Sequence, residues 1–294
     1  PDMIRDVQFY AGAAPADVPA ATSAVVSVNS WDGAPRQGAR DIDGAVDISA
    51  HAARLFVMGP IDRKEKATFA FAARRTYLEA YLQILKWAQV VDTAFSAPEF
   101  SEISGRLAYR PHPDHRILFT NLFAADSLKL VDSEDESLIE IDGVFELRNA
   151  LFLSSIDHLW TPSDRFQWQT TVAYTFNQSF MNRDLGGVQS NKFVTHRGFA
   201  RTDLTWTLDR YEIKLGADVS LFKDLAQGEI EDPRGFPDWA FSALGNFGIE
   251  QIELGDRPHY ADASVYLQHI WRGPVQVRVG TRGRYAGATK EWLF

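Results

Sequence analysis

The sequence predicts an all-β protein, an antiparallel β-barrel that crosses a lipid bilayer. Three observations favour this fold class. Apolar and polar residues alternate with a period of two, short and long connections alternate along the chain, and aromatic residues gather beside the short connections. No stretch approaches the roughly 18 apolar residues that a membrane-spanning helix needs. Any crossing of a membrane is therefore expected to use strands, whose polar inner face lowers the mean hydropathy, here -0.22.

Period-two alternation is clearest over residues 275–285. One face of this segment is apolar and begins with three valines, while the other face carries Arg278, Arg282 and Arg284. A row of arginines needs water or polar partners, and the apolar face needs a large hydrophobic surround. Similar alternation occurs at residues 166–176, 200–208 and 211–221. Several such strands in one chain favour a wall with lipid outside and water or a polar plug inside.

Connection lengths alternate as they do in bacterial barrels, where short periplasmic turns and long outer loops follow one another. Short turns are predicted at residues 59–65, 111–115, 161–165, 209–210 and 272–274. Long connections are predicted at residues 87–99, 126–143, 178–197 and 223–260. A soluble meander has no physical reason to lengthen every second connection.

About eleven barrel strands follow from these patterns. They are predicted at residues 44–51, 53–58, 66–80, 100–110, 116–126, 144–157, 166–177, 198–208, 211–221, 261–271 and 275–285. Residues 75–91 fit two structures, because Leu78, Leu82 and Leu85 have helical spacing. The strand there is expected either to continue or to pass into a short helix in the outer loop.

Aromatic residues flank the short turns. They are Tyr109, Trp160, Phe166, Trp168, Trp206, Tyr211 and Trp271. A single tryptophan in such a place usually belongs to a core, but the shared placement of all these residues favours an aromatic girdle at the periplasmic interface of a membrane.

Composition excludes several classes of protein. Hydrophobic residues make up 45% and charged residues 23% of the 294 residues, which excludes a disordered chain. The net charge of -9 and the lack of a basic stripe argue against nucleic acid as a partner. The sequence has no cysteine, and therefore no disulfide, thiol nucleophile or cysteine-ligated zinc. Residues 1–5 lack the features of a signal peptide, as expected of a mature or truncated chain.

Residues 1–42 differ from the rest of the chain. Short strands are predicted at residues 7–10 and 23–28, joined by a segment rich in Ala, Pro and Gly. Residues 29–40 contain two glycines, a proline and several charges, and are predicted to be a linker. The barrel is expected to occupy residues 43–294.

Several of these segments resemble the TonB-dependent outer-membrane receptors. Residues 6–17 and 23–29 are similar to the end of that family's plug domain, in which a V-E-V-Y strand precedes a Gly-rich turn and a final V-V-x-V strand. Residues 44–49 resemble the first barrel strand, and residues 53–61 resemble the second strand with its G-P-[LI] turn. Strands that enter periplasmic turns in the family are matched by residues 107–117 and 200–208.

The resemblance has two departures. The family's plug turn usually continues Pro-Ala-[EQ]-[YF]-Gly, whereas here Pro15, Ala16 and Asp17 lead to Val18 and Pro19, which implies a remodelled turn. The segment that engages TonB and most of the plug do not occur in this sequence. Because a complete barrel of the family has about 22 strands, about eleven strands are expected to be half of one. The remainder would lie on the same chain or on another chain.

Ligand-binding residues are predicted at two places. Arg278, Arg282 and Arg284 lie on the polar face of the last predicted strand, where they would contact an anionic substrate or, as the pattern favours, plug carboxylates and lumen water. Trp239 and Phe241 lie in the longest predicted loop, which is the best candidate for ligand or partner contact.

No catalytic residue, metal site or cofactor is expected. The histidines lack metal-ligand spacing, and His112 and His115 fit a solvated turn better than a metal site. The acidic run at residues 132–142 lacks the spacing and central glycine of a calcium loop, which favours a solvated outer loop. No nucleophile-elbow or phosphate-loop motif occurs, and the chain is therefore not expected to be an enzyme.

The resemblance implies an outer-membrane receptor that imports a scarce nutrient, such as a metal chelate, vitamin or glycan, with energy delivered to the plug through TonB. Two alternatives stay open: a structural barrel subunit of a larger outer-membrane assembly without transport, and a small self-contained porin or barrel enzyme. The expected location is the outer membrane of a Gram-negative bacterium. The expected partners are outer-membrane lipid and lipopolysaccharide, the remainder of the barrel, and the TonB complex if a full plug exists.

Overall fold

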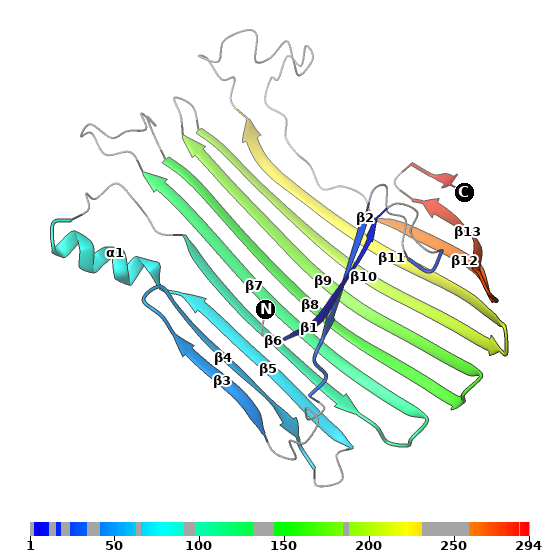
Figure 1. Cartoon of the computed structure of the whole chain (residues 1–294). Coiled ribbons are helices and arrows are strands. Elements are labelled where there is room, and N and C mark those ends of the chain that lie inside the picture. The colour runs from blue at the N-terminus through cyan, green and yellow to red at the C-terminus, as the bar shows by residue number, and fades with distance from the viewer. Residues whose placement is uncertain are drawn as a thin grey trace.

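A broad, curved sheet with a small hairpin on its concave side dominates the computed structural model of the chain (Figure 1). The structure describes residues 3–11, 16–18, 24–33, 42–62, 66–90, 98–131, 144–184, 188–230, 259–287 and 289–293. No helix in these residues is long and apolar enough to cross a membrane.

Twelve antiparallel strands form the large sheet in the order of the sequence. They are β3 (Asp43–Ile48), β4 (Ala52–Pro60), β5 (Ala67–Thr76), β6 (Glu99–Tyr109), β7 (His115–Val131), β8 (Val144–Ser163), β9 (Phe166–Asp184), β10 (Val188–Leu208), β11 (Tyr211–Ile230), β12 (Tyr260–Arg272), β13 (Gln276–Ala286) and β14 (Glu291–Leu293). In the described part of the chain, the edge strands β3 and β14 each pair with one neighbour, so these residues form an open sheet.

The predicted all-β, antiparallel fold is confirmed. Each of the eleven predicted segments overlaps one strand, and β14 adds a twelfth strand of 3 residues. The prediction at residues 66–80 is wrong at its end, because β5 stops at Thr76 and helix α1 (Leu78–Trp87) follows. The helical spacing of the leucines indicates this change. The Tyr77 hydroxyl donates to Ala52 O at 3.1 Å and also to Ser49 O, which fixes the start of the helix to the turn between β3 and β4.

Strands β8 to β11 extend much further toward the long loops than predicted. β8, β9, β10 and β11 contain 20, 19, 21 and 20 residues. The long connection predicted at residues 178–197 is wrong, because β9 and β10 stay paired as far as Asp184 and Val188. About ten residues of a tilted strand cross a bilayer. Beyond it neither face meets lipid, so alternation fades while the backbone hydrogen bonds continue, and a prediction based on alternation ends too early.

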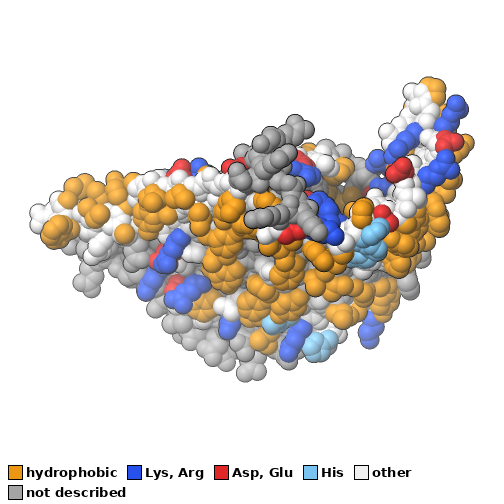
Figure 2. Space-filling model, turned by 90° about the horizontal axis from the view of Figure 1, so that it is seen from below, with side chains coloured by type: hydrophobic (Ala, Val, Ile, Leu, Met, Phe, Trp, Pro, Cys, Tyr) orange, Lys and Arg blue, Asp and Glu red, His pale blue; other side chains and the backbone are white. Residues whose placement is uncertain are grey.

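Strand register gives the sheet two chemically different faces. Along β13, Val277 and Val279 share the outer face, and on β12 Val265 and Leu267 lie on that same face. Large hydrophobic side chains on this face are strongly exposed, for example Val265 at 57% and Val279 at 66%. Figure 2 shows hydrophobic side chains over much of the convex face. A surface of this kind needs lipid or another apolar surround.

A separate two-stranded sheet, β1 (Ile4–Ala11) and β2 (Ala24–Ser30), lies on the concave side (Figure 1). These strands overlap the two short strands predicted at residues 7–10 and 23–28. A small core joins the end of this hairpin to the inner face of β4 and β5. It consists of Met3, Phe56, Met58, Ala70 and Ala72, with Trp31 packed against them.

Gly33 allows the chain to approach the sheet closely after the hairpin. Its φ is 79°, in the left-handed region that favours glycine. A Cβ atom at this position would lie 2.2 Å from the backbone oxygen of Phe69. Only glycine fits here, so the path of the chain is fixed at the inner wall of β5.

Candidate functional site

The polar inner face of β10 to β13 is the candidate functional site. Register places polar residues of adjacent strands in rows on this face, with Asp203 beside Gly216 and Tyr266, and Asp218 beside Arg201 and Ser264. Tyr266 donates its hydroxyl proton to Asp203. Arg201 donates to both oxygens of the same carboxylate, at 2.6 and 2.8 Å. A bidentate bond of this type fixes both side chains.

Arg282 belongs to this network. Its guanidinium forms an ion pair with Asp218 and also donates to Ser264. The side chains of Arg282 and Asp218 are only 12% and 13% exposed. Arg282 also donates to the backbone oxygen of Ala16 at 3.2 Å, which ties β13 to the N-terminal part of the chain.

The other two predicted arginines have different surroundings. Arg284 pairs with Asp262 on β12 at 2.5 Å. Arg278 lies on the same face of β13 and is exposed. The partners of Arg282 and Arg284 are carboxylates of neighbouring barrel strands, whereas the sequence favoured carboxylates of the plug. Contact of these three arginines with a ligand stays a prediction.

Residues 16–18 are held against this wall by a second set of bonds. Lys214 on β11 donates to the Asp17 carboxylate at 2.7 Å, and Arg201 donates to the Asp17 backbone oxygen at 2.6 Å. The Ala16 amide donates to Gln268 on β12 at 2.9 Å. Gly280 leaves room for this contact, because a Cβ atom there would lie 2.8 Å from the Ala16 Cβ.

A second attachment of the N-terminal segment lies on the same inner face, at strands β5 to β7. Asp32 pairs with Arg116 on β7 at 2.5 Å and with Arg110 at 3.6 Å. Thr68 on β5 donates to the Asp32 backbone oxygen at 2.7 Å, and Arg106 on β6 donates to Ser30 O at 2.9 Å. The N-terminal segment is therefore bonded to the inner wall at two separate places, near residue 17 and near residue 32.

Sequence reasoning missed Asp17 and its basic partners as a contact. The available signal was weak: Lys214 and Arg201 lie on polar faces of alternating strands, and Asp17 lies where the turn departs from the family pattern. Sequence does not show that a residue near position 17 meets strands two hundred positions later. The predicted ligand residues Trp239 and Phe241, and the acidic run at 132–142, lie outside the described residues.

The short-turn end of the sheet carries an aromatic band on its outer face. Trp160 contacts Phe166 and Trp168, with ring centroids 6.0 and 6.1 Å apart, and Phe166 contacts Trp206 at 5.1 Å. Tyr211 stacks on His269 at 5.5 Å. These contacts join aromatic residues from several strands at one level, as the girdle interpretation expects.

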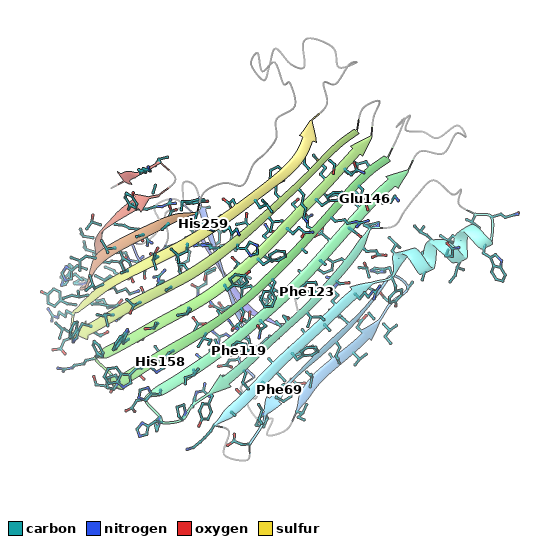
Figure 3. All side chains as sticks on the ribbon, turned by 180° about the vertical axis from the view of Figure 1, so that it is seen from behind. Phe69, Phe119, Phe123, Glu146, His158 and His259 are labelled. Atoms are coloured by element: carbon teal, nitrogen blue, oxygen red, sulfur yellow. The ribbon has the colours of Figure 1, made fainter. Side chains whose placement is uncertain are left out.

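Two histidines meet in this band, and sequence reasoning did not pair them. The Nδ1 atom of His115 lies 3.0 Å from the Nε2 atom of His158, and the rings are nearly parallel, 6° apart. Figure 3 shows His158 near the short-turn end of the sheet. The described residues contain no group of three or more His, Cys, Asp or Glu that could hold a metal ion.

Comparison with known proteins was made for sequence and for structure. No protein-family model and no curated protein matches the sequence. Solved structures match over 96% of this chain: the copper transporter OprC (TM-score 0.63, 10% identity, 42% of its length), the FrpB iron transporter from Neisseria meningitidis (0.65, 12%, 46%) and the ferripyoverdine receptor of the outer membrane of Pseudomonas aeruginosa (0.60, 13%, 41%). The chain has the barrel fold of the TonB-dependent receptors.

The likeness to TonB-dependent receptors covers nearly all of this chain but less than half of each matched protein. At 10% to 13% identity the likeness concerns the fold. In the described residues an apolar outer wall, a polar inner wall and an N-terminal segment bonded to the inner wall occur together within that fold.

Proposed function

We propose that this chain is part of an outer-membrane TonB-dependent receptor that imports a scarce nutrient, such as a metal chelate, vitamin or glycan. In this proposal residues 1–42 are the end of the plug and the linker, and residues 43–294 are the first part of the barrel. The chain binds and gates and performs no chemistry. TonB supplies the energy that moves the plug.

One observation carries the proposal: residues 16–18 and 30–32 are bonded to the polar inner wall of a sheet whose outer wall is apolar. Lys214 and Arg201 hold residue 17, while Arg116 and Arg110 hold residue 32. A segment held by a few polar contacts can be released, because each contact exchanges for water when the segment moves. This arrangement is the one expected of a plug inside a barrel.

The class of nutrient is proposed from the neighbours. The matched proteins are named for copper, iron and a ferric pyoverdine. Metal chelates are therefore the first substrates to test for this chain. Anionic chelates also suit Arg278, which lies exposed on the inner face of β13.

A structural barrel subunit without transport is the second candidate. The dense ion pairing of the inner wall supports it, since Arg282 and Arg284 are engaged by Asp218 and Asp262. A small self-contained barrel has less support. In the described residues β3 and β14 do not pair with each other, and an open edge in lipid leaves backbone groups unsatisfied.

The test is a deletion of the whole gene in its own bacterium, with growth and labelled uptake measured under limitation for iron, copper, a corrinoid vitamin and glycans in turn. The proposal predicts that one uptake is lost, that the plasmid-borne gene restores it, and that a protonophore abolishes it. Uptake unchanged for every nutrient, with the protein present in the outer membrane, would support the structural subunit. Recovery of the protein only in the soluble fraction would overturn the membrane assignment.

A further inference from the structure

A hollow on the outer face, at the long-loop end of β10 to β12, is not explained by transport. It has a volume of about 410 Å³, and its lining includes His196, Lys223 and His259. Register places His196 beside Lys223. His259 precedes Tyr260, whose partner is Phe222, and therefore comes next to Lys223 on the same face. Three groups that carry or accept protons thus form one row across three strands.

On the short-turn side of this row the outer face consists of apolar residues, two of them small. Gly198 pairs with Leu221, and Leu221 pairs with Ala261, so these three residues form the adjacent row toward the short turns. A Cβ atom at Gly198 would meet only the Leu221 Cβ, at 4.0 Å, which leaves open space above the glycine. The hollow therefore combines a basic upper rim with a shallow apolar floor.

The height of the row matches a membrane interface. His196 lies ten positions before Trp206 of the aromatic band on β10. At about 3.3 Å per residue this is about 33 Å along the strand, and a strand tilt of roughly 40° reduces it to about 25 Å, the height of the apolar band of an outer-membrane barrel. Figure 3 shows His259 at the long-loop end of β12, away from His158 at the short-turn end. The basic row thus lies where headgroups of the outer leaflet begin.

The groups around the row favour an anion. The Tyr174 hydroxyl lies 2.7 Å from Nδ1 of His196, which orients the ring and leaves Nε2 for another partner. The carboxylates at this height, Asp224 and Asp262, are on the inner face, where they bind Tyr260 and Arg284. No Asp or Glu is among the described residues that line the hollow. Charge complementarity therefore selects a negatively charged occupant.

We infer that this hollow binds the phosphate-bearing headgroup of an outer-leaflet lipid, with the first part of an acyl chain over Gly198 and Ala261. Lys223 pairs with the phosphate, N–H groups of the histidines donate hydrogen bonds to it, and the apolar floor receives the chain. The inference rests on the proposed function for the placement in the outer membrane. It adds a binding site on the outer wall that is separate from the path through the barrel.

The test uses the full-length protein, purified in neutral detergent and titrated with diphosphorylated lipid A, with bound lipid counted by native mass spectrometry. The variant Lys223→Gln/His259→Gln is expected to weaken lipid A binding about fivefold or more, because each basic group near an anionic surface contributes a factor of that order. The matched control is Lys129→Gln/His269→Gln, which removes the same residue types from other parts of the outer face and is expected to keep full affinity.

A second variant separates the shape of the hollow from its charge. Gly198→Leu fills the floor and keeps every basic group, and it too is expected to weaken binding. Equal loss in the control variant, equal binding of an uncharged lipid with the same acyl chains, or full competition by inorganic phosphate would each overturn the inference. These outcomes concern only lipid binding, so they are distinct from the uptake and fractionation results that test the proposed function.

Discussion

Arg282 illustrates how the inner wall accommodates charge at the residue scale. Its guanidinium contacts the Asp218 carboxylate, the Ser264 hydroxyl and the Ala16 carbonyl, and both members of the ion pair are largely shielded from solvent. A shielded ion pair adds little net stability compared with an apolar pair, but removal of one member leaves the other charge without a partner. Such a residue holds the wall and residue 16 together, and this role requires no ligand.

Replacement of Arg282 by methionine is therefore expected to destabilise the protein by about 3 kcal/mol, since it leaves the Asp218 charge shielded and unpaired. Urea unfolding of the full-length protein in lipid vesicles measures this change. The additional substitution Asp218→Asn is expected to restore much of the loss. Arg165→Met provides the control, because the pair of Arg165 and Asp209 is 70% and 91% exposed. A similar loss in both arginine variants would contradict the expectation.

Asp17 allows a second test at this scale. The substitution Asp17→Asn removes the ion pair with Lys214, which is made at 2.7 Å. Because hydrogen bonds to charged groups contribute roughly 1.5–3 kcal/mol, exchange of the Ala16 amide, which is bonded to Gln268, is expected to accelerate by about tenfold to a hundredfold. Hydrogen–deuterium exchange with mass spectrometry gives the rate. Asp209→Asn, at an exposed turn, serves as the control and is expected to leave the rate unchanged.

At the scale of single elements, successive residues of a strand lie on opposite sides of the sheet. On β13 the neighbours Val277, Arg278 and Val279 alternate between lipid and lumen in the proposed membrane. Alternation of this kind identifies a strand within the bilayer, while its loss toward the long loops marks where the strand leaves the bilayer. The element therefore carries two kinds of information: where the backbone is paired, and where lipid surrounds it.

Cysteine labelling tests this alternation directly, because the 294 residues contain no cysteine and any cysteine elsewhere in the full-length protein can be replaced by serine. In vesicles that carry the full-length protein, a membrane-impermeant maleimide is expected to modify Arg278→Cys and to leave Val277→Cys and Val279→Cys unmodified. A lipid-soluble maleimide is expected to modify the two valine positions. Equal reaction of all three positions with the impermeant reagent would show that no lipid covers the outer face of β13.

At the scale of the whole molecule, the described strands form one curved wall with two ends. β3 pairs only with β4, and β14 pairs only with β13, in the part of the chain that the structure describes. The matched receptors contain more than twice the length that this chain covers. A wall of this size has the curvature of a large barrel, and its free edges need further strands before the wall is stable in lipid.

We therefore expect the protein in outer membranes to be heat-modifiable and to have a mass well above 33.0 kDa, with further strands on the same chain or on a bound partner. Unheated and heated samples on one gel, together with the intact mass, test this expectation. A compact heat-modifiable monomer near 33.0 kDa would contradict it and favour a small closed barrel.

The sequence alone determined the features that depend on local chemistry. Lipid on one side and water on the other impose a period of two, so the strands around residues 211–221 and 275–285 were predictable from alternation. The gathering of aromatic residues such as Trp160 and Trp206 beside the short turns was visible in the sequence, and their rings contact Phe166. Their place at a membrane interface stays a prediction. Leucines at helical spacing signalled helix α1.

The tertiary structure decided everything that depends on register between distant segments. Arg282 on β13 pairs with Asp218 on β11, and Lys214 on β11 pairs with Asp17 near the N-terminus. No sequence pattern identifies either pair of partners. The extension of β9 and β10 to residues 184 and 188 also depended on pairing, because backbone hydrogen bonds continue after the side-chain pattern has faded. Alternation predicts the face of the sheet on which a side chain lies. Only the tertiary structure determines which charged side chains lie beside it on that face.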